Sequence, residues 1–188
     1  MFKKSICFIM TVLIIFTLCA CSDELDEKQV GKDMEQVLTE LFSAVQKQDK
    51  NSFISFFDDD VSAQLDFENG CQYVFDTYQG ELVSVDFRSA GHTGKLFVPG
   101  EQICYAYMSF RIITSENEYE VCVEFYTQYE SKYPNDPYKI RQFSIFPKLD
   151  DGSFIPKESD GNFSEDWIAF GQRHGIYYPG WRDEEITS

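Results

Sequence analysis

Basic residues are scarce in this chain. The 188 residues contain 16 Lys and Arg against 32 Asp and Glu, so the formal net charge is −16 at pH 7. No long run of Lys or Arg occurs, and such a basic patch is what proteins use to bind the phosphate backbone. The composition therefore excludes the electrostatic pattern of a nucleic-acid-binding protein.

Histidine and the common catalytic motifs are also scarce. The two histidines, His92 and His174, stand at no metal-ligand spacing from a cysteine or from each other. The acidic run at residues 58–60 lacks the alternating carboxylates and distal glutamate of a calcium loop, so we interpret it as a solvated interhelix loop. Phosphate-binding glycine loops and the G-x-S-x-G nucleophile motif are missing. We therefore predict no metal, no cofactor and no catalytic residue.

The longest apolar run lies at the N-terminus. Lys3 and Lys4 precede a mostly apolar stretch over residues 6–18, a layout typical of an export signal. The following residues, Leu18-Cys19-Ala20-Cys21, resemble the lipobox of bacterial lipoproteins. This resemblance implies cleavage before Cys21 and attachment of a diacylglyceryl group to its thiol. An uncleaved transmembrane anchor is the alternative, but the run is short for a span of about 20 residues.

The lipobox implies a simple domain organisation. Residues 1–20 are then a lipoprotein signal peptide, residues 21–30 a polar tether, and residues 31–188 a single domain with an aromatic C-terminal tail. The lipid on Cys21 would hold this domain at the cell membrane, on its extracytoplasmic side. The acidic charge repels an anionic bilayer, so we expect the lipid rather than a protein surface to be the anchor.

Apolar residues at a period of 3.6 predict three helices in the first part of the domain. The first spans about residues 31–48, and a short second helix buries aromatic residues between positions 53 and 57. The third runs over about residues 62–79, with Leu65 and Cys71 on its inner side. Gly80 follows at the position of a left-handed C-terminal cap.

After Gly80 the apolar period changes to two, which predicts four strands. Val83, Val85 and Phe87 point inward on the first strand, which ends before a glycine-rich turn at residues 91–100. The other strands lie around residues 104–112, 121–126 and 142–145. Short connections favour antiparallel neighbours. The predicted fold class is α+β, with three N-terminal helices packed on a curved four-stranded antiparallel sheet.

The two faces of this predicted sheet differ in composition. The inward side chains include no Asp, Glu, His or Lys, which favours a packed core over a cavity for proton-transfer chemistry. Alternation places five candidate binding residues on the outward face: Tyr105, Tyr107, Arg111, Tyr126 and Tyr138. Tyr and Arg are enriched in binding hot spots. The alternatives are that the aromatic tail at residues 176–181 covers this face, or that two copies associate through it.

Alternation also predicts the state of the cysteines. Three cysteines follow Cys21, an odd number that argues against a disulfide framework. Cys104 is expected to point inward and Cys122 outward, so a disulfide between them would need a bulge. We expect Cys71, Cys104 and Cys122 to be reduced, with Cys71 and Cys104 buried as small apolar residues.

Helices followed by a curved antiparallel sheet resemble the nuclear transport factor 2-like (cystatin-like) cone. Three stretches are similar to a family of uncharacterised Gram-positive lipoproteins assigned to that fold: LFSAVQKQD at residues 41–49, FDTYQGELVS at 75–84 and GIYYP at 175–179. The likeness covers roughly residues 30–180, and the middle stretch is the most specific. It implies a fold and a location but no activity, so no catalytic residue is carried over.

These observations favour a lipid-anchored extracytoplasmic domain that binds a protein partner or a small ligand without catalysis. One alternative is an enzyme that acts on a small hydrophobic molecule inside the cone, which needs an enclosed cavity and a buried acid or base. The other is a membrane-bound immunity or secretion accessory protein.

Overall fold

The computed structural model describes residues 26–98, 101–128, 132–136, 138–154 and 174–178. Within these ranges the chain forms four helices and five strands, so the fold is α+β. The helices are α2 (Glu27–Gln46), α3 (Lys50–Ile54), α4 (Asp59–Ser62) and α5 (Phe67–Thr77). The strands are β1 (Leu82–Val98), β2 (Glu101–Thr114), β3 (Glu118–Gln128), β4 (Ile140–Pro147) and β5 (Gly175–Ile176).

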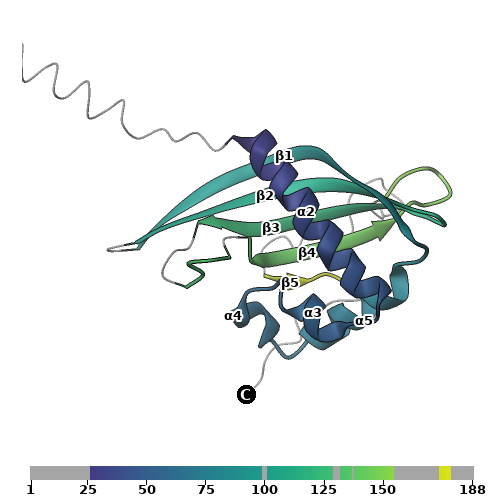
Figure 1. The fold of residues 1–188 in the computed structure, drawn as a ribbon, viewed down its shortest axis with the longest axis horizontal. Helices are drawn as coiled ribbons and strands as arrows, with labels where there is room; N and C mark the ends of the chain where they lie inside the picture. Colours follow the sequence, from purple (N-terminus) through teal and green to yellow (C-terminus); the bar gives the residue numbers. More distant parts are fainter. Residues whose placement is uncertain (1–25, 99–100, 129–131, 137, 155–173, 179–188) are drawn as a thin grey trace, which may run out of the picture.

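The strands form one sheet in the order β1-β2-β3-β4-β5. β1 to β4 are antiparallel as expected, whereas β5, from the C-terminal tail, adds a fifth strand parallel to β4. The helices cover one face, which we call the inner face; α2 crosses it obliquely from β1 toward α5 (Figure 1). The opposite face is called the outer face.

α2 is the longest helix, and its ends are set by local side chains. The Asp26 carboxylate accepts hydrogen bonds from the backbone amides of Lys28 and Gln29, which satisfies two free donors of the first turn. The helix therefore begins at Glu27, and residues 27–30 of the expected tether are helical. It ends before Gln48, which has a positive φ of 56°.

The predicted third helix is instead two helices. The Asp58 carboxylate accepts from the backbone amide of Asp60 at 2.7 Å, and the short α4 starts at Asp59, three residues earlier than expected. A turn then separates α4 from α5, and Leu65 in this turn is 90% exposed. The prediction that Leu65 points inward was wrong because the helical period breaks at this turn. Gly80 has a positive φ of 84°, as predicted, but it is not the helix cap, because α5 ends at Thr77 and its C-cap residue Tyr78 is extended.

β1 is twice as long as predicted. The expected glycine-rich turn continues as strand, with Gly91 and Gly94 inside it. A Cβ on Gly91 would lie 2.7 Å from the ring of Tyr107 on β2, and one on Gly94 would lie 2.1 Å from the ring of Tyr105. These glycines therefore leave room for aromatic rings from the neighbouring strand, a use of glycine inside sheets.

The prediction that Val83 points inward on β1 was also wrong, because the register shifts between Leu82 and Ser84. Because of this irregularity Val83 is 66% exposed, whereas Leu82 packs against the core. Val85 and Phe87 face the core as expected.

Apolar side chains from helices and sheet fill the space beneath the inner face. The buried cluster includes Met34, Leu38, Phe42, Phe53, Phe57, Met108, Phe110, Val123, Phe125, Phe143 and Ile145. Burial of this surface is the main favourable term in folding. Cys71, Cys104 and Cys122 are reduced, as predicted, and Cys71 and Cys104 are buried as expected. Cys122, which was expected only to point outward, is buried as well. None of the helices in the described ranges is long and apolar enough to cross a membrane.

Candidate functional site on the outer face of the sheet

The candidate site lies on the outer face, where polar and aromatic side chains alternate with the buried apolar ones. Strand pairing places Tyr105 opposite Tyr126, Tyr107 opposite Glu124, and Arg111 opposite Glu120. Four of the five residues predicted for this face, all except Tyr138, lie on it. They come from β2 and β3, whose even and odd positions respectively fill the core.

Tyr105 and Tyr126 enclose a cation. The guanidinium carbon of Arg141, on β4, lies 5.2 Å from the ring centroid of Tyr105 and 5.0 Å from that of Tyr126, within cation–π range. The same guanidinium forms an ion pair with Glu124 at 3.0 Å. Arg141 is buried. The two rings and the carboxylate therefore hold one positive charge in a fixed position on the sheet.

His174 completes this cluster from the C-terminal tail. The Arg141 guanidinium donates to its ring, and Glu124 Oε1 lies 3.6 Å from His174 Nε2. Burial, followed by the nearby charge of Arg141, lowers the pKa of His174 from its usual 6.5. The neutral ring is therefore the form that this contact favours.

Tyr107 occupies the next position along the face and contacts Cys122. Its hydroxyl donates a hydrogen bond to the Cys122 sulfur, and burial raises the pKa of Tyr107. Burial also raises the pKa of Cys122 to about 11, so the thiol is protonated at neutral pH. Such a thiol is a poor nucleophile. The pair is a packing contact rather than a reactive centre.

Arg111 belongs to a charged group at the far end of the face. Glu118 pairs with both Arg111 and Lys148, the latter at 2.7 Å. Glu120, the partner of Arg111 across the strands, has a pKa raised mainly by burial. Negative and positive groups alternate here, so the group neutralises itself.

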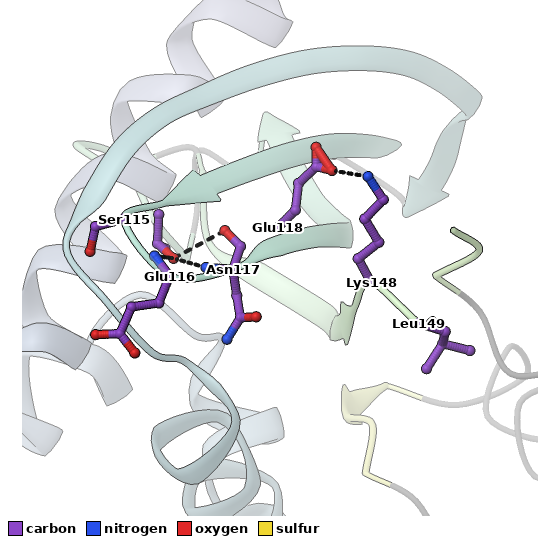
Figure 2. A pocket seen from close by; sticks show the side chains of 7 residues that line it. Ser115, Glu116, Asn117, Glu118, Lys148 and Leu149 are labelled. Carbon is purple, nitrogen blue, oxygen red and sulfur yellow. Dashed lines mark hydrogen bonds and ion pairs between the residues drawn. The ribbon is translucent and has the colours of Figure 1, made fainter. Parts of the chain in front are cut away.

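Beside these charges lies an open pocket of about 380 Å³ at the β2–β3 turn. Figure 2 shows Glu118 and Lys148 bonded to each other along one wall, with the turn residues opposite. The turn is closed by Thr114, whose hydroxyl oxygen accepts from the amides of Glu116 and Asn117. The pocket is polar and shallow, unlike an enclosed apolar cavity for a small substrate.

The outer face is not equally accessible along its width. Over β3 and β4 it is closed, since Cys122 is buried and Ser144 is only 1% exposed. Over β1, Asp86, Arg88 and Ser89 are exposed. The face open to a ligand therefore lies on the β1–β2 side.

Tyr138 does not belong to this face. Its ring lies 6.0 Å from that of the core residue Phe125, and its hydroxyl donates to the carboxylate of Asp33 on α2 at 2.7 Å. The prediction was wrong because β4 begins only at Ile140, so the alternation of β4 does not extend back to Tyr138.

The tail contributes to the outer face in part. Tyr177 packs on Phe146, with ring centroids 5.4 Å apart, and Phe154 and Tyr178 pack beside them. Tyr177 and Tyr178 of the tail therefore cover the outer face beside Phe146, at the β4 edge, whereas Ile176 lies in the inner core. Residues 179–181 and the lipidation candidate Cys21 lie outside the described residues.

The acidic run at residues 58–60 is not an open carboxylate cluster. Lys132 binds Asp58 at 3.1 Å and Asp60 at 2.6 Å, so an ammonium group occupies the position between them. Asp58 is only 2% exposed, which corrects the prediction of a fully solvated loop. Among the described residues, no group of three His, Cys, Asp or Glu side chains is placed to hold a metal ion.

Comparison with protein families identifies the central part of this structure. A family described as "Domain of unknown function (DUF5104)" matches residues 40–138. The chain belongs to this family. The DUF5104 match runs from the second half of α2 through β3, and includes the stretches 41–49 and 75–84 but not 175–179. No curated protein matches the chain significantly.

The DUF5104 match contains the predicted tyrosines and Arg111 but stops before Arg141 and His174. Sequence reasoning missed these two residues. A register shift between Glu124 and Phe125 turns Arg141 toward the outer face, out of the alternation of β4. His174 reaches the site from 33 positions further along the chain. The unusual density of aromatic residues around His174 was the available signal.

Proposed function

We propose that this DUF5104 protein is a lipid-anchored binding domain on the extracytoplasmic side of the cell membrane, without catalytic activity. In this proposal the ligand, a protein partner or a small molecule, contacts the β1–β2 side of the outer face. The observation that carries the proposal is the contrast between the two faces. One is filled by apolar side chains, and the other presents Tyr105, Tyr107 and Arg111 next to the exposed β1 residues.

The anchor is supported by the sequence Leu18-Cys19-Ala20-Cys21 after a short apolar run. α2 begins at Glu27, so five residues separate Cys21 from the helix. A chain of this length reaches at most about 20 Å. The domain would therefore stay close to the bilayer surface.

A cone of the nuclear transport factor 2-like (cystatin-like) type is the finer fold that we propose. The support is a long helix that crosses a sheet of bent strands (Figure 1). Three register shifts along β1 are consistent with this bend, since bulges curve a strand.

Binding rather than catalysis is supported by the chemistry beneath the inner face. An enzyme in the cone would need an ionisable group inside an apolar cavity. The apolar cluster of described residues occupies that space, and the buried carboxylate of Asp58 is already neutralised by Lys132. A carboxylate held in such an ion pair is not free to act as a general base.

The binding face is tested by photo-crosslinking in cells with benzoylphenylalanine at Ser89, an exposed outer-face position beside Ser109. Gln36, exposed on α2, is the matched control position. We expect a discrete adduct from position 89 but not from position 36, weakened by Tyr107→Ala in a variant that remains folded. Equal labelling at both positions, or an adduct insensitive to Tyr107→Ala, would contradict the assignment.

The anchor is tested separately by Cys21→Ala. We expect loss of metabolic labelling with a palmitate analogue and loss of membrane retention after salt washing. Ala is also needed at Cys19 as a control, because that cysteine precedes the cleavage site and its replacement should leave labelling unchanged. Retained labelling in the Cys21→Ala variant would exclude Cys21 as the site of lipid attachment.

A further inference from the structure

β5 is a strand of two residues that the chain brings from its C-terminal tail. Gly175 pairs with Gln142 and Ile176 with Phe143, both parallel to β4 (Figure 1). The amide of Tyr177 then donates to the carbonyl of Phe143 at 2.9 Å. The segment therefore lies at the edge of the sheet as a short peptide ligand would in strand addition.

Ile176 fits against α5 because Gly70, on that helix, has no side chain. A Cβ built on Gly70 would lie 2.5 Å from Ile176 Cβ and 2.9 Å from its carbonyl oxygen, distances that atoms do not adopt. The three nearest atoms to this position all belong to Ile176. Gly70 thus forms a notch between α5 and β4 that is specific for this one residue.

The side chains of this segment contact both faces of the sheet. Ile176 is buried in the core cluster, whereas Tyr177 is buried against Phe146 on the outer face. Gly175 precedes them with a φ of 145°, a conformation that side chains other than glycine rarely adopt. The groove therefore selects a glycine, a β-branched aliphatic residue and an aromatic residue in succession.

We propose that this groove, formed by β4 and by Gly70 of α5, is a strand-acceptor site that also takes the Gly175–Tyr177 segment of a second copy of the chain. The segment that fits the groove is the chain's own, so a second copy offers an identical ligand. Among the described residues, two residue pairs and one further backbone hydrogen bond join the segment to β4, so the main-chain pairing that exchange breaks there is short. Exchange of an identical element is a low-cost route to a dimer.

Charge opposes this association without preventing it. Each chain carries a formal charge of −16, so two copies repel one another at low ionic strength. Salt screens such repulsion over a distance of about 10 Å at 0.1 M. Exchange is therefore expected to increase with salt.

Two full-length variants test the exchange. Gly70→Ala blocks the groove but leaves the tail intact, and Ile176→Ser leaves the groove open but removes the side chain that fills it. Neither variant can fill its own groove, whereas the tail of the first can fill the groove of the second. We expect the equimolar mixture to sediment as a 1:1 dimer at 0.3 M salt and each variant alone as a monomer.

The matched control is the double variant Gly70→Ala/Ile176→Ser, which offers neither tail nor groove. It is expected to form no dimer with either single variant. A mixture that remains monomeric, while circular dichroism shows both single variants folded, overturns the proposal.

A second measurement does not depend on the folding of the Gly70→Ala variant. Benzoylphenylalanine replaces Tyr178, beside the docked segment, and tagged and untagged chains are mixed before illumination. We expect an adduct between tagged and untagged chains that maps to β4 or α5 and is lost with Ile176→Ser. Adducts only within single chains overturn the proposal.

Discussion

Replacing Lys132 by Met tests the ion pair that occupies the acidic run. The ammonium group lies 3.1 and 3.3 Å from the two carboxylate oxygens of Asp58 and 2.6 Å from Asp60. Asp58 is 2% exposed and Lys132 25%. Removal of the cation leaves a buried carboxylate that still accepts a hydrogen bond from the Asp60 amide.

The expected loss in the free energy of unfolding can be estimated in two ways. At 3.1 Å and an effective dielectric constant of about 20, the attraction is about 5 kcal/mol before desolvation is subtracted. Breaking a buried pair by removing one partner costs about 3–5 kcal/mol. Because Lys132 is partly hydrated, we expect a loss of about 2–4 kcal/mol in the free energy of unfolding. This corresponds to a fall in Tm of about 5–12 °C.

The assay is urea unfolding at pH 7 followed by circular dichroism. Asp58→Asn keeps the helix cap and removes the charge, so the double variant Asp58→Asn/Lys132→Met should recover at least half of the loss. Lys50→Met is the control, since the side chains of Lys50 and Glu68 are 40% and 65% exposed and such pairs contribute at most about 1 kcal/mol. A loss below about 1 kcal/mol for Lys132→Met, or no recovery in the double variant, refutes the reasoning.

Three further predictions follow from hydrogen-bonded and titratable groups. Tyr119→Phe removes the hydroxyl that bonds the backbone at the end of α5, so we expect a loss of about 1–3 kcal/mol in urea unfolding. The lowered pKa of His174 means that the folded tail binds fewer protons than the unfolded tail. Tail docking should therefore weaken as the pH falls below about 6.5. The measurement is hydrogen exchange of the Tyr177 amide, which should become faster after correction for intrinsic rates. The variant His174→Gln should abolish this pH dependence. With pKa values raised by burial to about 12 for Cys71 and about 11 for Cys122, alkylation at pH 8 should be at least about 100-fold slower than in urea, as counted by mass spectrometry.

The division between the two faces of the sheet was predictable because side-chain alternation is a strictly local property. Once residues 104–112 are a strand, Tyr105, Tyr107 and Arg111 must share a face opposite to Met108 and Phe110. The same reasoning gave the reduced cysteines. Local periodicity thus predicted the outer-face residues of β2 and β3.

Errors arose where one residue interrupts the period. Glycine normally indicates a turn, yet Gly91 and Gly94 continue β1 because tyrosine rings from β2 take the space of their side chains. Val83 changes side through a bulge, and Leu65 lies in a turn between two short helices. In each case the deciding contact or break lies in a partner strand or in a backbone hydrogen bond, which periodicity does not encode.

The cluster around Arg141 could not be predicted for a different reason. It joins Tyr105 of β2, Glu124 of β3, Arg141 of β4 and His174 of the tail, four segments whose order across the sheet follows only from tertiary pairing. A bulge also turns Arg141 away from the face that alternation assigns to it. Long-range pairing and bulges therefore limit how much of a sheet surface can be predicted from sequence.

The tail and the open side of the outer face lie at opposite edges of the sheet, and this separation has a consequence for both proposals. Ile176 and Tyr177 close the β4 edge, whereas Asp86, Arg88 and Ser89 are exposed on β1. A ligand on the β1–β2 side therefore does not compete with the tail for the same atoms. Loss of crosslinking at position 89 and loss of tail exchange should occur independently, so Ile176→Ser should leave the adduct at position 89 intact. If Ile176→Ser abolished that adduct in a folded protein, the two edges would be coupled through the Arg141 cluster that lies between them.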